Sequence, residues 1–166
     1  YDIAGYKKYI LIAPTWKQDD EGRSIFPFGV TANDLFEMLQ KVGEDNNALV
    51  IFRAHLNSGD SVKQSDYKNV QVMPYTKYPV TEEFLWVADL LVSDWSSIVF
   101  DYLPLKRPTV FLDVPSPFKN GFTLGPEHRF GFVASSLGQL AEALGGLVAH
   151  FGAAQGEGQV ALEAHH

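Results

Sequence analysis

The chain of 166 residues has room for one domain, and its 46% hydrophobic and 20% charged residues exclude large-scale disorder. Its net charge of -7 excludes a broad positive field that would attract nucleic acid, so no nucleic-acid partner is expected. Because the sequence has no cysteine, disulfides and thiolate chemistry are excluded as well.

Apolar runs rich in β-branched and aromatic residues alternate with helical segments along the chain. This alternation is typical of βαβ units, in which parallel strands form one sheet with helices on both faces. The sequence therefore predicts an α/β fold with a parallel sheet. In chain order, strands are predicted over residues 9–15, 48–54, 70–74, 89–94, 108–113 and 131–135.

The first predicted helix covers residues 31–43, where apolar residues recur on one face. Thr31 or Asn33 suits its N-cap, and Gly43 is predicted to end it. A second helix is predicted over residues 81–88. It begins at the cap-like Thr81 and carries acidic residues in its first turn, where the helix dipole favours negative charge.

A last helix is predicted over residues 135–151, and the rest of the chain, residues 152–166, reads as a polar tail. The predicted domain is therefore residues 5–151. His165 and His166 resemble the end of an added tag. Since the sequence starts without Met, we interpret it as a fragment of a longer protein.

Polar clusters follow four of the predicted strands. In open parallel sheets, ligands bind outside the carboxyl ends of the strands, where loops and helix N-termini converge. The clusters are Thr15, Trp16 and Lys17 after the first strand, Arg53 and His55 after the second, Asp94, Trp95, Ser96 and Ser97 after the fourth, and Asp113 after the fifth.

Ser96 and Ser97 stand where the fourth strand meets a predicted helix. Backbone N–H groups and hydroxyls at a helix start suit a phosphate group. Arg53 and His55, with Lys17 as a further cation, supply the positive charge that such a site needs. Asp101 follows Ser97 by one helical turn, so it is expected on the same face, where its carboxylate can accept hydrogen bonds from ribose hydroxyls.

Simpler interpretations of these residues remain open. Ser96 or Ser97 also fits a plain helix N-cap, and Asp94 fits an Asx-turn. His55 also fits a hydrogen-bonded loop histidine. Trp86, Phe100 and Tyr102 are interpreted as core aromatic residues. A ligand site is favoured because four clusters share one edge of the sheet.

Three stretches within residues 9–113 form a recognisable set. They are Ala13-Pro14-Thr15, Arg53-x-His55, and Asp94-Trp95-Ser96-Ser97 with Asp101, followed by Arg107-Pro108. This set resembles the CDP-glycerol glycerophosphotransferase family, whose members polymerise or prime teichoic acids. The resemblance implies a GT-B architecture, in which this chain is the C-terminal, Rossmann-like half that binds the nucleotide donor.

The resemblance implies transfer of glycerol phosphate from CDP-glycerol to a teichoic-acid-type polyol-phosphate or cell-surface glycan acceptor, with release of CMP and without a cofactor or metal. The acceptor site and the base belong to the missing N-terminal GT-B domain, so this fragment alone is expected to be inactive. The full-length protein is expected in the cytoplasm, peripheral at the inner face of the cell membrane.

Carried onto this sequence, the resemblance makes Ser96 and Ser97 the ligands of the donor pyrophosphate, with His55 stabilising or protonating the leaving phosphate. Thr15 and Asp101 line the pocket, and Arg53 and Asp94 complete the donor-binding set. The family's Tyr- and Arg-Gly-rich loop is replaced here by a stretch containing Gly125-Pro126, His128 and Arg129, and Arg129 is a candidate for a donor phosphate.

Two alternatives remain open at this point. The first is a GT-B glycosyltransferase domain that uses another nucleotide-sugar donor. The second is a Rossmann-like module for protein interaction, which has capped helices and binds no nucleotide.

Overall fold

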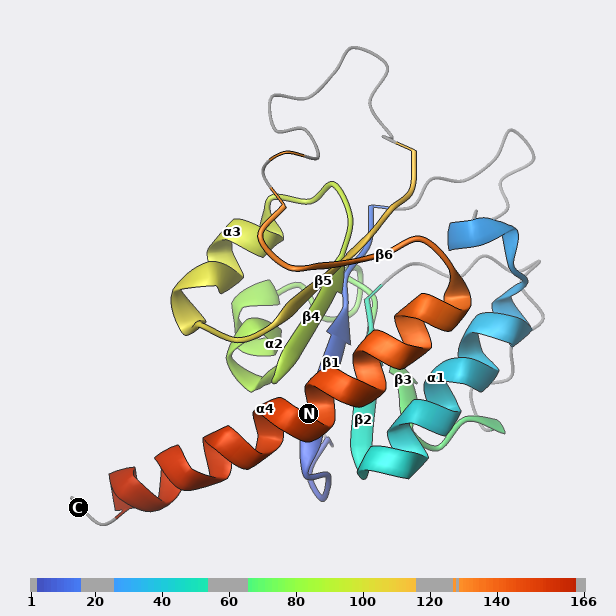
Figure 1. Cartoon of the computed structure of the whole chain (residues 1–166). Coiled ribbons are helices and arrows are strands. Elements are labelled where there is room, and N and C mark those ends of the chain that lie inside the picture. Colours follow the sequence, from blue (N-terminus) through green and yellow to red (C-terminus); the bar gives the residue numbers. More distant parts are fainter. Residues whose placement is uncertain (1–2, 16–25, 54–65, 116–126, 128, 164–166) are drawn as a thin grey trace.

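The computed structural model describes residues 3–15, 26–53, 66–115, 127 and 129–163. Within these residues, six parallel strands form one sheet with the order β3-β2-β1-β4-β5-β6 (Figure 1). The strands are β1 (Lys8–Ile12), β2 (Ala48–Phe52), β3 (Val70–Val72), β4 (Leu90–Ser93), β5 (Thr109–Leu112) and β6 (Phe132–Ala134). All six predicted strands and the α/β fold are confirmed, with each strand shorter than predicted.

The strand order reverses between β1 and β4, which pair in parallel with Ile10 opposite Leu90. From β1 the chain moves outward to β2 and β3, and then returns to place β4, β5 and β6 on the other side of β1. This order is that of the doubly wound Rossmann fold, which binds ligands outside the carboxyl ends of the strands at the point of reversal. The loops after β1 and β4 are therefore the first place to look for a site.

Helices cover both faces of the sheet, as Figure 1 shows. One face carries α1 (Ala32–Asn46) and α4 (Leu137–Glu163), and the other carries α2 (Thr81–Val87) and α3 (Ile98–Tyr102). Two short 3-10 turns, η1 (Pro27–Gly29) and η3 (Leu103–Leu105), flank α1 and α3. In the part of the chain that the structure describes, no helix has both the length and the apolar character needed to cross a membrane.

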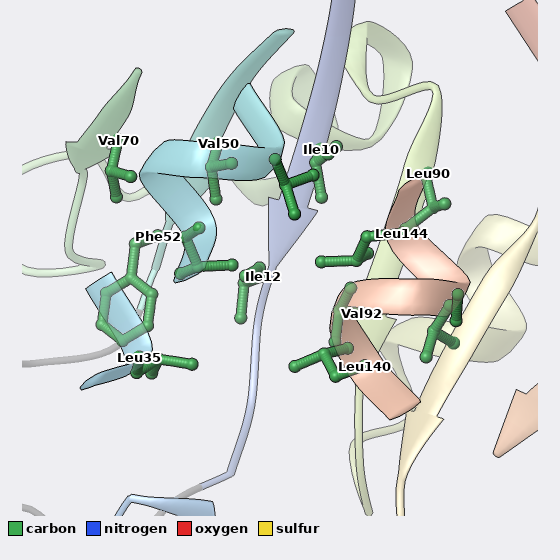
Figure 2. Close-up of a cluster of buried hydrophobic side chains, with 14 of the residues drawn as sticks. Ile10, Ile12, Leu35, Val50, Phe52, Val70, Leu90, Val92, Leu140 and Leu144 are labelled. Carbon is green, nitrogen blue, oxygen red and sulfur yellow. The ribbon is translucent and has the colours of Figure 1, made fainter. Parts of the chain in front are cut away.

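The core has two layers because successive strand residues point to opposite faces of the sheet. Ile10 and Ile12 face the layer under α1 and α4, whereas Leu11 faces the layer under α2 and α3. Both layers contain fully buried side chains, and the central strands β1, β2, β4 and β5 are mainly apolar as a result. In the first layer, Figure 2 labels Ile10, Ile12, Leu35, Val50, Phe52, Val70, Leu90, Val92, Leu140 and Leu144.

The N-terminus of α1 is capped as predicted. The hydroxyl of Thr31 accepts a hydrogen bond from the Asp34 N–H, and the Asp34 carboxylate accepts one from the Thr31 N–H. The predicted end at Gly43 is wrong, because the helix continues to Asn46 and Asn47 takes the left-handed conformation with φ 49°.

Gly43 instead allows close packing against the chain before β3. A Cβ atom at this position would lie 2.5 Å from the Cβ of Asn69 and 2.9 Å from the carbonyl oxygen of Ala48. The small residue is therefore required by a tertiary contact that the local sequence does not reveal.

Two other helix ends differ from the prediction. Thr81 is the first residue of α2 and not its cap, since Val80 holds the cap position, while Glu82 and Glu83 lie in the first turn as predicted. Helix α4 continues through residues 152–163, which the sequence analysis assigns to a polar tail. Glycine weakens a helix by about 1 kcal/mol per residue but does not end it as proline does. The domain limits 5–151 stay a prediction.

Candidate functional site

The two serines lie between β4 and α3, at the carboxyl edge of the sheet. Ser96 accepts a hydrogen bond from the Ile98 N–H at 3.3 Å, which is a turn-forming contact. Ser97 precedes α3 with a helical backbone, and its exposed side chain makes no cap hydrogen bond. Ser97 therefore holds the N-cap position of α3 without a side-chain cap bond, and Ser96 closes a local turn before it, so neither hydroxyl acts as the N-cap acceptor that the simpler interpretation predicts.

Asp94 ties together the two loops at the point where the strand order reverses. One oxygen of its buried carboxylate, Oδ1, accepts hydrogen bonds from the Thr15 N–H at 2.9 Å, the Thr15 hydroxyl at 2.6 Å and the Trp95 N–H at 2.6 Å. The predicted nearness of Thr15 and Asp94 is thus observed. The bond to Trp95 reaches the next residue, whereas an Asx-turn is closed by a bond to the residue two positions on, so it is not the bond that the Asx-turn interpretation predicts. The bonds to Thr15 hold the loop after β1 against the loop after β4.

Arg53 is fully buried, and its guanidinium is used inside the domain. Nη1 donates to the Met73 carbonyl at 3.2 Å, and Nη2 donates to the Tyr78 carbonyl at 2.9 Å and to the Thr81 hydroxyl at 3.3 Å. Both terminal nitrogens are therefore engaged by protein atoms, while Nε is buried without a hydrogen-bond partner among the described residues. The structure does not support the predicted direct role of Arg53 in donor binding.

A pocket of about 730 Å³ opens between α2 and α3. Ser96, Ser97 and Asp101 all line it, so the predicted placement of Asp101 on the face of Ser97 agrees with the structure. Among the described residues, its lining consists of Tyr75, Thr81, Glu82, Leu85, Trp86, Ser96, Ser97, Ile98, Phe100, Asp101, Pro104 and Leu105.

The chemistry of this pocket is aromatic and acidic. Tyr75, Trp86 and Phe100 offer ring surfaces, and Glu82 and Asp101 offer carboxylates. None of the described residues that line the pocket is basic. Such a surface suits a flat, hydroxyl-bearing group, because rings stack on rings and carboxylates accept hydrogen bonds from hydroxyls. Because the pocket carries carboxylates, a phosphate group is better placed at the turn formed by Ser96 and Ser97, the serine turn, than deep in the pocket.

Sequence reasoning misassigned two of these aromatic residues. Trp86 is 68% exposed and Phe100 is 37% exposed, so their interpretation as core is wrong, whereas Tyr102 is buried as predicted. Helical periodicity could have identified Trp86, because Phe84 and Ala88 define the buried side of α2 and Trp86 lies midway between them.

Arg129 reaches the same edge from the segment before β6. Its Nη1 lies 3.1 Å from Oδ1 of Asp113, and its guanidinium carbon lies 5.2 Å from the centre of the Trp95 ring. The indole of Trp95 donates to the Val114 carbonyl at 2.9 Å. The Nη2 atom of Arg129 is buried without a hydrogen-bond partner among the described residues. Arg129 thus packs at this edge against Asp113 and against Trp95, which is next in sequence to Ser96, and its buried Nη2 has no acceptor among the described residues.

Several predicted site residues lie outside the described residues, and their roles stay predictions. His55 is among them, together with Trp16, Lys17, Gly125, Pro126 and His128. The described part of the site therefore consists of the serine turn, the Thr15–Asp94 contact, Arg129 and the pocket between α2 and α3.

Residues 1–116 match a family model described as CDP-glycerol:poly(glycerophosphate) glycerophosphotransferase. Over 105 residues the chain is 31% identical to the teichoic acid ribitol-phosphate polymerase TarL of Staphylococcus aureus, covering 63% of this chain and 18% of that protein. Over 108 residues it is 34% identical to the teichoic acid poly(glycerol phosphate) polymerase of Bacillus subtilis, covering 63% of this chain and 14% of that protein. The chain thus spans less than a fifth of the length of these relatives.

Solved structures of the wall teichoic acid polymerase TagF are similar in fold. One superposes with a TM-score of 0.64 at 23% identity, covering 90% of this chain and 38% of that chain. A TagF variant soaked with CDPG superposes with a TM-score of 0.62 at 26% identity, covering 89% of this chain and 37% of that chain. The prediction of a Rossmann-like half of a GT-B architecture is confirmed.

Proposed function

Because the chain belongs to the CDP-glycerol:poly(glycerophosphate) glycerophosphotransferase family, we propose that it is the donor-binding half of an enzyme of teichoic acid synthesis. The enzyme transfers glycerol phosphate from CDP-glycerol to a teichoic-acid-type or glycan acceptor and releases CMP. The observation that carries this proposal is the aromatic and acidic pocket beside the serine turn, at the carboxyl edge of the sheet. Relatives that polymerise glycerol phosphate and a TagF structure soaked with CDPG give further support.

In this proposal the nucleoside of the donor occupies the pocket. Its base stacks on exposed rings such as Trp86, and its ribose hydroxyls donate to Asp101 or Glu82. The serine turn then lies where the nucleoside ends, so Ser96 and Ser97 contact the pyrophosphate through hydroxyl and backbone N–H groups. This arrangement accounts for a pocket whose described lining carries carboxylates and no cation.

Charge for the phosphates comes from outside the pocket. Nη2 of Arg129, which has no partner among the described residues, suits a phosphate oxygen, and Nη1 stays paired with Asp113. His55 is proposed to protonate the bridging oxygen as it leaves. Thr15 stabilises the carboxyl edge of the sheet through its hydrogen bond to Asp94. Arg53 is not among the proposed ligands, because its terminal nitrogens bond protein atoms.

The reaction that follows is an in-line phosphoryl transfer. An acceptor hydroxyl attacks the phosphorus that carries the glycerol, and the bond from that phosphorus to the bridging oxygen breaks to give CMP. The hydroxyl proton passes to a base, which we assign to an N-terminal GT-B domain outside this chain. Catalysis of this kind depends mainly on positioning and on stabilising charge. We also place the full-length enzyme at the inner face of the cell membrane.

Thermal melting with a panel of nucleotides tests the proposal. A ligand present at 100 times its Kd stabilises the fold by about 2.7 kcal/mol, which raises the Tm by about 5–11 °C for a domain of this size. We expect this rise with CDP-glycerol and CMP and none with UDP or UDP-glucose. CDP-ribitol belongs in the panel, because TarL is a ribitol-phosphate polymerase.

The double substitution Ser96→Ala and Ser97→Ala should remove most of the rise with CDP-glycerol and leave the Tm without ligand nearly unchanged. Ser136→Ala is a matched control, since Ser136 accepts a hydrogen bond at the start of α4 and does not line the pocket. The absence of a rise with every cytidine nucleotide would contradict the proposal. An equal rise with uridine compounds would favour a nucleotide-sugar donor.

A further inference from the structure

The guanidinium of Arg53 lies behind one wall of the pocket. Its central carbon is 4.1 Å from the centre of the Tyr75 ring and 4.2 Å from the centre of the Phe84 ring, so the group is held between two aromatic faces. Its N–H groups bond the carbonyls of Met73 and Tyr78 and the hydroxyl of Thr81. A single side chain from the end of β2 thus contacts several points of the segment from Met73 to Thr81, the first residue of α2.

This segment carries two residues of the pocket wall. Tyr75 and Thr81 line the pocket, whereas Arg53 does not. Tyr75 is 44% exposed, so burial alone does not fix its ring. The backbone bonds from the N–H groups of Lys77 and Tyr78 to the Pro74 carbonyl close the turn without reaching the Tyr75 side chain. The stack on Arg53 is therefore the described contact that orients this ring.

We infer that Arg53 is a positioning residue for the nucleotide pocket: it sets Tyr75 and Thr81 in place without touching the ligand. The inference rests on the proposed function of the same site. Arginine suits this task because its planar fork stacks and donates in fixed directions, whereas lysine has a flexible stem and a point charge. The inference also explains a fully buried arginine whose two terminal nitrogens donate to carbonyls instead of a carboxylate, with Nε left without a partner among the described residues.

Arg53→Lys keeps the charge and loses the stack and the fork. We expect it to weaken the affinity for CDP-glycerol about tenfold at a temperature where circular dichroism shows a fully folded chain. Amide hydrogen exchange over residues 73–82 should become about tenfold faster without ligand. The control is Leu144→Ala, which removes a buried side chain from the opposite face of the sheet. It should lower the Tm and change neither the affinity nor this exchange.

Unchanged affinity and unchanged exchange in Arg53→Lys would overturn the inference, and so would equal effects in Leu144→Ala. Arg53→Met provides a second test if the lysine variant does not fold, because it removes the buried charge and keeps an apolar stem between the rings. The same two changes are expected from it. If the unsubstituted chain binds no nucleotide, the proposed function fails, and faster exchange over residues 73–82 still decides whether Arg53 positions the wall.

Discussion

Replacing Asp94 with alanine removes two hydrogen bonds that join the loop after β1 to the loop after β4, and a third bond, from the Trp95 N–H, within the loop after β4. Each bond to a charged acceptor contributes about 1.5–3 kcal/mol, and the three share one oxygen, so they contribute less than their sum. The Thr15 N–H also loses its partner at a partly buried position. We therefore expect Asp94→Ala to lower the free energy of unfolding by about 4 kcal/mol, or roughly 8–16 °C in Tm.

Urea unfolding of a double-mutant cycle measures this contact. Thr15→Val removes only the hydroxyl bond, which spans 2.6 Å, and should cost about 1 kcal/mol in the original chain. In the Asp94→Ala background it should cost nearly nothing, so the coupling energy is about 1 kcal/mol. Asp94→Asn keeps an acceptor at the same place and should cost about half as much as alanine. A loss below about 1 kcal/mol for Asp94→Ala, or a coupling near zero, would refute the structural role.

Other predictions concern single contacts, each measured by urea unfolding. Gly43→Ala should lower the free energy of unfolding by about 1–3 kcal/mol, because its Cβ would crowd Asn69; an unchanged value would contradict the close approach. Thr31→Ala should cost about 1 kcal/mol through loss of the α1 cap, and no loss would show that the cap is not needed. Burial raises the pKa of Tyr102 above its ordinary value of 10.0, so the folded chain loses stability as the pH rises past 10. Tyr102→Phe should cost about 1 kcal/mol at pH 7 through the lost bond to the Ala88 carbonyl, and it should flatten that alkaline decline; an equal decline in both proteins would contradict this assignment.

The central strands can be predicted from the sequence because both faces of a parallel sheet are buried, which makes strands such as β2 continuous apolar runs. Helix ends are harder to predict. Gly43 fits the local rule for a helix end, yet contact with Asn69 keeps it inside α1, and Asn47 takes the left-handed position instead. Tertiary packing overrides the local preference there.

The candidate site divides into a part that the sequence predicts and a part that it does not. Ser97 and Asp101 share a pocket because their spacing is one helical turn, a local property. The surroundings of Arg53 depend on Tyr75 and Phe84, which lie more than 20 residues further along the chain. The residues next to Arg53 in the sequence therefore do not tell whether its guanidinium is buried or binds a phosphate. The predicted site residues thus include some that line the pocket, such as Ser97 and Asp101, and others that stabilise the carboxyl edge of the sheet, such as Arg53.

The indole N–H resonance of Trp86 tests the central claim most directly. Trp86 is 68% exposed and lines the pocket, so a base stacked against it must change the surroundings of its ring. The resonance is assigned by its absence in Trp86→Phe and followed by NMR during titration with CDP-glycerol. We expect it to shift along a saturation curve that gives the same Kd as calorimetry. Binding measured by calorimetry that leaves this resonance in place would contradict the assignment of the pocket between α2 and α3 to the donor.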